Sequence, residues 1–263
     1  MYPFRLGTTS YIIPDDILPN VRYLAGKTQD VELVLFEVDD GANNLPGPEV
    51  VAELGALAQA HALTYTVHLP LDLRLGAGGD EGHVSLVKAR AVIERTRVLN
   101  PWAYVLHLDG RELLASGSDG DRDARAVAWQ VQAVRALELA AGWAGGPGQL
   151  AVENLERYPL DFWTPVLERV PVSRCVDIGH LWLDHHDPLP FLQAALPRTR
   201  VVHLHGVGQR DHQSLVHMPP EKLNPVIDCL CETFTGVVTL EVFGEADFHS
   251  SVDAVNASVN RSK

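Results

Sequence analysis

Six short apolar runs of this sequence each end in a histidine or a carboxylate. The terminal residues are, in chain order, His68, His107, Glu153, Asp177, His203 and Glu241. Imidazole and carboxylate groups together are the ligand mixture typical of Zn²⁺ or Mn²⁺ in proteins. Carboxylates brought together at one place would repel one another unless cations compensated their charge. The pattern therefore predicts a site for divalent metal ions.

Further candidates follow two of these runs. His180 comes three residues after Asp177. Asp211 and His212 lie in the segment that follows the run containing His203. We expect all three to contact the metal ions. Glu37 ends a further apolar run, Leu35-Phe36-Glu37, which precedes these six. It is expected to orient a ligand or to bind substrate. The other histidines lack a strand-end position and are expected at the surface or at helix caps: His61, His83, His185, His186, His217 and His249.

Eight apolar, β-branched runs alternate with segments of helical periodicity, which predicts parallel strands covered by helices. The strand candidates are Phe4–Thr9, Val31–Val38, Leu63–Leu69, Ala103–Leu108, Gln149–Asn154, Ser173–Ile178, Arg200–His205 and Val237–Phe243. Helices are expected near 14–25, 47–61, 82–99, 122–142, 159–169, 187–195, 219–234 and 246–259.

Eight such units in 263 residues predict one α/β domain, a (β/α)8 TIM barrel over residues 1–263. An open, doubly wound sheet is disfavoured because no G-x-G-x-x-G loop follows the first strand. In a TIM barrel the carboxyl ends of the strands form the active face. The strand-end histidines and carboxylates would therefore meet there.

The composition favours a small-molecule substrate. The formal net charge of −13 would repel nucleic acid and anionic membranes, so neither is an expected partner. The three cysteines do not form a disulfide framework, and the first residues do not resemble a signal peptide. These features predict a cytoplasmic protein, either a monomer or a homodimer.

The strand-end residues resemble those of the xylose isomerase-like TIM barrels, a superfamily that includes endonuclease IV. Glu153, Asp177, His203 and Glu241 look like the four-ligand set of its sugar isomerases and epimerases, whereas His68, His107 and His180 look like the additional ligands of endonuclease IV. The segment 202–205 is similar to a His-Leu-Asn-Asp strand end, with His205 at the Asn position. Arg210-Asp211-His212 resembles an Asp-Arg-His motif in altered order.

Three segments, 5–14, 31–37 and 210–215, resemble the cobamide-remodelling phosphodiesterases of this superfamily. The resemblance implies hydrolysis of adenosylcobalamin to adenosylcobinamide phosphate and α-ribazole. The implied partner is therefore a corrinoid phosphodiester.

The resulting hypothesis is a hydrolase with two or three Mn²⁺ or Zn²⁺ ions per chain, which would polarise the phosphodiester and activate water. Glu153 and Glu241 are the predicted catalytic residues, which would bridge ions or accept the proton of the water. The residues assigned to substrate binding are Arg210, which would pair with the phosphate, Tyr11, Glu37 and His205. Trp102, Trp182 and Phe243 are further candidates for contact with a large planar ligand.

Three alternatives remain open from the sequence. A sugar isomerase or epimerase would use one Mn²⁺ held by Glu153, Asp177, His203 and Glu241, and the extra histidines argue against it. An apurinic-site endonuclease would need a basic surface, for which 21 basic against 34 acidic residues leave little room. A cobamide-binding or metal-sensing protein would bind without turnover.

Overall fold

The strands form a closed barrel of parallel neighbours in sequential order, in agreement with the predicted (β/α)8 fold. The computed structural model describes residues 2–35, 44–114, 119–208 and 210–261. The strands are β1 (Arg5–Thr9), β2 (Asp30–Val34), β3 (Thr64–His68), β4 (Tyr104–His107), β5 (Leu150–Glu153), β6 (Ser173–Asp177), β7 (Thr199–Leu204) and β8 (Val237–Leu240). Strand two was expected to reach Val38, but β2 ends at Val34, and residues 36–43 lie outside the described part.

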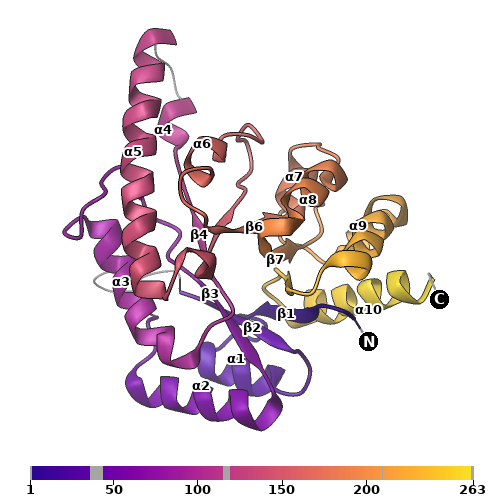
Figure 1. The fold of residues 1–263 in the computed structure, drawn as a ribbon. Helices are drawn as coiled ribbons and strands as arrows, with labels where there is room; N and C mark the ends of the chain where they lie inside the picture. Colours follow the sequence, from indigo (N-terminus) through magenta and orange to yellow (C-terminus); the bar gives the residue numbers. More distant parts are fainter. Residues whose placement is uncertain (1, 36–43, 115–118, 209, 262–263) are drawn as a thin grey trace.

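Helices surround the barrel (Figure 1). They are α1 (Ile17–Leu24), α2 (Pro48–His61), α3 (Val84–Thr96), α4 (Arg111–Leu114), α5 (Asp119–Ala144), α6 (Thr164–Leu167), α7 (Ile178–Leu183), α8 (Pro188–Ala195), α9 (Pro220–Thr233) and α10 (Glu245–Arg261). In Figure 1, α4 and the start of α5 extend beyond the other helices. No helix in the described ranges is both long enough and apolar enough to cross a membrane.

Two helical predictions need correction. The helix expected over 159–169 is the single turn α6, because Pro165 has no N–H to donate to the carbonyl of Asp161 and the helix can begin only close to it. The turn α7 was not expected; it begins directly after β6, where the Asp177 side chain accepts a hydrogen bond from the His180 N–H. This cap brings His180 back toward the end of its own strand.

The inward faces of the strands change from small apolar residues to chemically active ones along the barrel axis. Side chains two apart on a strand share a face. Ala151 therefore points the same way as Glu153, and Cys175 the same way as Asp177. The apolar layer, formed by Ala103, Val105, Ala151, Cys175 and Val201, is a core cluster separate from the main one. Cys175 is buried there as a small core residue, as expected.

Trp102 belongs to the opposite end of the barrel from the candidate site. Its ring packs against the small apolar layer and lies between the guanidinium groups of Arg5 and Arg200, at 4.8 and 4.7 Å. The expected contact between Trp102 and a planar ligand is therefore wrong. Trp182 is buried, with 5% of its surface exposed, and Trp102 is partly buried, so packing explains both side chains.

Candidate metal centre

Three groups of side chains lie at the carboxyl ends of the strands, and groups 1 and 2 share Glu153. In each group the ligand atoms lie within 4.8 Å of one another. Group 1 is His68, His107 and Glu153; group 2 is Glu153, Asp177, His203 and Glu241; group 3 is His180, His205, Asp211 and His212. The Cys175 sulfur also lies within this distance of ligand atoms of Glu153 and His203. The fold thus brings together every residue that the sequence analysis assigned to metal.

Two carboxylates face two groups at once with different oxygens. Glu153 Oε2 lies 3.3 Å from His68 Nε2 and 3.1 Å from His107 Nε2, whereas its Oε1 lies 3.3 Å from His203 Nδ1. Asp177 likewise places Oδ2 3.8 Å from His203 Nδ1 and Oδ1 3.3 Å from His205 Nε2. This is the arrangement expected of carboxylates that bridge neighbouring ions.

Glu241 connects groups 2 and 3 through a single oxygen. Its Oε2 lies 3.2 Å from His203 Nδ1 and 3.4 Å from His212 Nε2. The three groups therefore form one continuous centre.

Two ligand histidines are held through a ring nitrogen that lies close to a backbone carbonyl oxygen. Nδ1 of His68 lies 2.8 Å from the Leu69 carbonyl oxygen, and Nδ1 of His180 lies 2.9 Å from that of Asn154. A ring that donates through one nitrogen presents a lone pair on the other. Such anchoring is typical of histidines that bind metal.

His203 is anchored by a carboxylate that the sequence analysis missed. Glu32 on β2 is fully buried, and its Oε2 lies 2.9 Å from His203 Nε2, which leaves Nδ1 toward group 2. The available signal was a charged residue inside the apolar run Val31–Val34, where an unpartnered carboxylate would be costly. A second missed residue is Glu156. It lines the cavity that lies over the ligand atoms, and its Oε2 lies 3.8 Å from His180 Nε2.

Several buried ligand atoms have no hydrogen-bond partner among the described residues. They are Asp177 Oδ2, His203 Nδ1, His205 Nε2 and Glu241 Oε2. Leaving buried polar atoms unpaired costs about 1–3 kcal/mol each, more where they are charged. Because these atoms also converge, the histidines and carboxylates of the centre fit divalent cations. They do so without a thiolate from the inward-facing Cys175.

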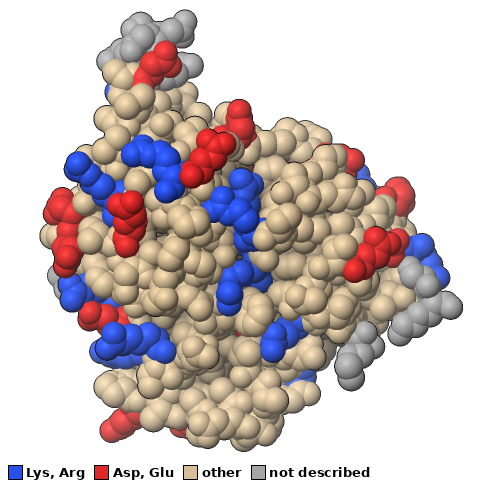
Figure 2. All heavy atoms as spheres, viewed as in Figure 1, with Lys and Arg blue, Asp and Glu red and all other residues tan. Residues whose placement is uncertain are grey.

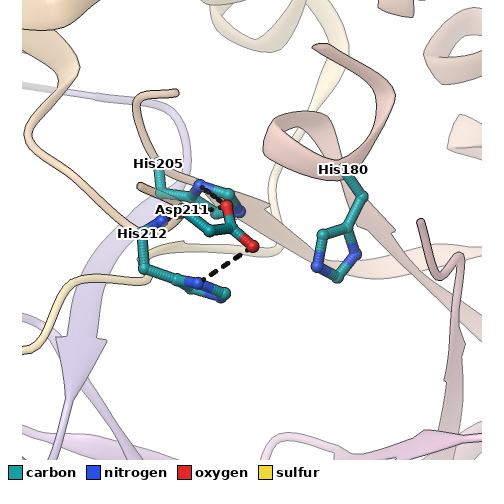
Figure 3. A group of neighbouring side chains, drawn as sticks. All are labelled: His180, His205, Asp211 and His212. Carbon is teal, nitrogen blue, oxygen red and sulfur yellow. Dashed lines mark hydrogen bonds and ion pairs between the residues drawn. The ribbon is translucent and has the colours of Figure 1, made fainter. Parts of the chain in front are cut away.

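Figure 3 shows the four side chains of group 3, which two glycines help to position. A Cβ on Gly179 would lie 2.0 Å from Cε1 of His205, so the ring can pack on α7 only because this residue has no side chain. Gly206 pairs with Gln213 in a short antiparallel bridge, which returns Asp211 and His212 over the end of β7. Asp211 then lies 3.3 Å from His205 Nδ1 and 3.2 Å from His212 Nδ1.

The charges of the centre favour protonated histidines while no cation is bound. Burial lowers the pKa of His212, but its contacts with the carboxylates of Asp211 and Glu241 outweigh burial and raise this pKa to about 11. Burial likewise lowers the pKa of His180, and the negative charges of Asp177, Glu153 and Glu241 raise it to about 9. Metal ions would replace these protons.

The residues assigned to substrate occupy different places. Tyr11 lines a cavity of about 810 Å³ beside the centre, and Phe243 lines both this cavity and the 420 Å³ cavity over the ligands. Arg210 instead pairs with Asp247 of α10, at 3.0 Å. His205 is fully buried in group 3, a placement that favours metal ligation over substrate contact. Glu37 lies outside the described residues.

Comparison with known families settles the wider relationship. The family model for the xylose isomerase-like TIM barrel matches residues 29–260. The chain belongs to this family. Among curated proteins, none matches the sequence significantly.

Solved structures share the fold over nearly the whole chain. A D-tagatose 3-epimerase-like protein is 15% identical with a TM-score of 0.74, covering 98% of this chain and 97% of its own. Endonuclease IV of Thermus thermophilus is 20% identical with a TM-score of 0.71, covering 98% and 99%. The TTHB071 protein of the same organism, from a crystal soaked with ZnCl₂, is 21% identical with a TM-score of 0.63, covering 98% of each chain. At these identities the likeness shows a shared fold.

The role of Glu32 leads to a first prediction. Replacing Glu32 by leucine, which is similar in size, should lower the affinity for Zn²⁺ about 10- to 100-fold, because His203 loses its orienting acceptor. Glu32→Gln should have a smaller effect, since an amide oxygen can still accept from His203 Nε2. Competition with a chelator measures both. Equal affinities in the wild type and Glu32→Leu would contradict the orienting role, provided thermal unfolding shows both proteins folded.

Proposed function

We propose that this protein is a metal-dependent phosphodiester hydrolase with more than one divalent ion, Mn²⁺ or Zn²⁺, per chain, and that its substrate is a corrinoid phosphodiester. The observation that carries the proposal is the placement of Glu153 and Asp177, each with two oxygens toward two ligand groups. A site for one ion needs no such bridging. Adjacent ions suit the displacement of one oxygen by another at phosphorus.

The residues of the centre have distinct proposed roles. Groups 1, 2 and 3 would hold the ions, which supply charge stabilisation and activate water when bound. Glu153 and Glu241 are the proposed catalytic carboxylates, which lie among the ligand atoms and would bridge ions or accept the proton of the attacking water. Glu32, Leu69 and Asn154 orient the histidines. Val34, Leu71 and Phe243 line the cavity above the ligands and limit the entry of water.

The space around the centre favours a substrate larger than a hexose. The 420 Å³ cavity over the ligands and the 810 Å³ cavity lined by Tyr11, Ile12 and Ile13 are neighbours that share Phe243 as a lining residue. A large, partly apolar ligand could occupy both. This supports the corrinoid phosphodiester that the sequence resemblance implies, with Tyr11 as a contact.

The charge of the protein supports a small-molecule substrate over duplex DNA. On the face shown in Figure 2, acidic side chains lie near many of the basic ones, and the basic groups make only a short row near the middle. The net charge of −13 also opposes a polyanion. Duplex binding depends on an extended basic surface.

A ketose epimerase is the second candidate. Group 2 by itself is a complete set of one histidine and three carboxylates for a single ion, and a D-tagatose 3-epimerase-like protein shares the fold. Groups 1 and 3 would then have no purpose. His205 Nε2, a buried atom of group 3 without a hydrogen-bond partner among the described residues, favours the hydrolase.

Product analysis separates the two functions. Protein loaded with Mn²⁺ or with Zn²⁺ is incubated with adenosylcobalamin and, separately, with D-fructose, and the products are identified by chromatography. The proposal predicts α-ribazole together with adenosylcobinamide phosphate. Intact adenosylcobalamin with epimerised ketose would replace the proposal by the second candidate.

The pKa values of the centre predict how metal binding depends on pH. The pKa values of His212, about 11, and His180, about 9, lie above neutral pH, so each bound ion must displace protons and affinity rises with pH. Between pH 8 and pH 6 the affinity for Zn²⁺ should fall about 10²-fold for each proton displaced. Calorimetry in buffers of different ionisation enthalpy counts the released protons. Binding without proton release would contradict the prediction.

A further inference from the structure

A further cavity lies beside the metal centre. Its lining has a net positive charge, whereas the metal centre is rich in carboxylates. The cavity has a volume of about 290 Å³ and is bounded by the loop after β3, the start of α4 and one face of α5. Arg74, Arg111 and Arg125 line it together with the carboxylates of Asp109 and Glu112. Its lining therefore carries one more positive than negative charge, in a chain whose net charge is −13.

One wall of this cavity is a rigid aromatic surface. Trp129 lines it from α5, and a Cβ on Gly76 would lie 2.0 Å from the Trp129 Nε1 atom, so the backbone packs directly on the indole. Behind Trp129, the ring of Phe162 lies at a centroid distance of 5.3 Å. The indole Nε1–H donates to the Asp109 carbonyl oxygen at 3.3 Å. A fixed aromatic wall favours a flat ring as its partner.

The cavity is connected to the metal centre through β4 and through an ion pair. Asp109 comes two residues after the ligand His107, accepts a hydrogen bond from the Tyr158 hydroxyl at 2.7 Å and pairs with Arg74 at 3.2 Å. Arg111 lies 3.9 Å from Glu156, which lines the cavity over the ligands. One residue from the lining of each cavity thus takes part in this pair.

We infer that this cavity is a subsite for an aromatic ring carrying an anionic group of its own, distinct from the phosphodiester that would be cleaved at the metal centre. Trp129 and the apolar atoms of Ala77 and Ala128 would contact the ring, while the guanidinium groups of Arg111 and Arg125 would face the anion. The inference stands on the cavity alone and does not depend on the proposed function.

The probe for this subsite is naphthalene-2-sulfonate, an aromatic anion whose sulfonate coordinates metal ions weakly. Calorimetry on the metal-loaded protein should give saturable binding, weaker for the neutral naphthalene-2-methanol and for methanesulfonate, which lacks the ring. Arg111→Gln should raise the Kd about fivefold. Arg22→Gln, at an exposed arginine paired with Glu53 away from the cavity, should change it less than twofold.

A charge-reversal pair gives the stricter test. Ala128→Glu introduces a carboxylate at an exposed lining position of α5 and should weaken binding about tenfold or more. Val127→Glu, the next residue along the same helix and also exposed, does not line the cavity and should change the Kd less than twofold. Unchanged binding in Ala128→Glu, or no binding of the sulfonate by the wild type, would overturn the subsite.

The outcomes separate this inference from the proposed function. Hydrolysis of adenosylcobalamin by a protein that does not bind the sulfonate would remove the subsite and leave the hydrolase in place. Binding that is lost in Ala128→Glu, in a protein without phosphodiesterase activity, would support the aromatic anion site and overturn only the proposed function.

Discussion

Glu153→Gln is expected to lower phosphodiester hydrolysis by a factor of about 10³ or more while leaving the barrel folded. Glu153 is shared by groups 1 and 2, and its two oxygens face three histidines at 3.1 to 3.3 Å. A neutral amide cannot replace a bridging carboxylate, so a charge stabilisation worth several kcal/mol would be lost at the reacting centre. The variant should also bind fewer ions per chain.

A matched variant controls for the change of residue type. Glu168→Gln makes the same substitution at an exposed position after α6 and should leave both activity and metal content unchanged. Activity is followed by chromatography of the adenosylcobalamin products, and metal content by elemental analysis of the dialysed protein. Near wild-type turnover in Glu153→Gln would remove this residue from the catalytic site.

Gly179→Ala is expected to disrupt group 3 through a single methyl group. The added Cβ would lie 2.0 to 2.4 Å from three atoms of the His205 ring, a clash that the ring can relieve only by leaving its place against Asp177 and Asp211. Overpacking of this kind costs about 1–3 kcal/mol of stability. We expect one fewer ion per chain and activity reduced about 10²-fold.

Gly142→Ala is the control for this substitution. Gly142 lies within α5, and a Cβ there meets nothing within 4 Å, so alanine should leave the activity unchanged and stabilise the helix by about 0.5–1 kcal/mol. Thermal unfolding and metal content are measured for both variants. A Gly179→Ala protein with wild-type metal content would show that His205 is not held by this contact.

The fold could be predicted from the sequence because buried parallel strands and amphipathic helices have different periods. The same reasoning located the ligands, since a polar residue that ends an apolar strand lies at the active face of a barrel. His68 and Glu241 needed only this argument. Reasoning from periodicity missed α7, because this short helix depends on the cap that the Asp177 side chain provides and not on a repeat of apolar residues.

Residues whose purpose is to hold other residues were the hardest to predict. Glu32 lies in the middle of a strand, and its partner His203 is 171 residues away, so only the closed barrel shows the pair. His205 could not be assigned from sequence either, because its place in group 3 depends on the absence of a side chain at Gly179. Trp102 is of a residue type that often contacts ligands. Only the direction of the strands in the barrel shows that it lies at the end opposite to the metal centre.

The number and position of bound ions test the central claim most directly. A crystal of the protein soaked with ZnCl₂, with anomalous scattering recorded on both sides of the zinc absorption edge, would locate each ion. We predict ions in at least two of the three groups, with Glu153 or Asp177 between neighbouring ions. A single ion held by Glu153, Asp177, His203 and Glu241, with groups 1 and 3 empty at saturating zinc, would contradict the multinuclear centre and favour an epimerase.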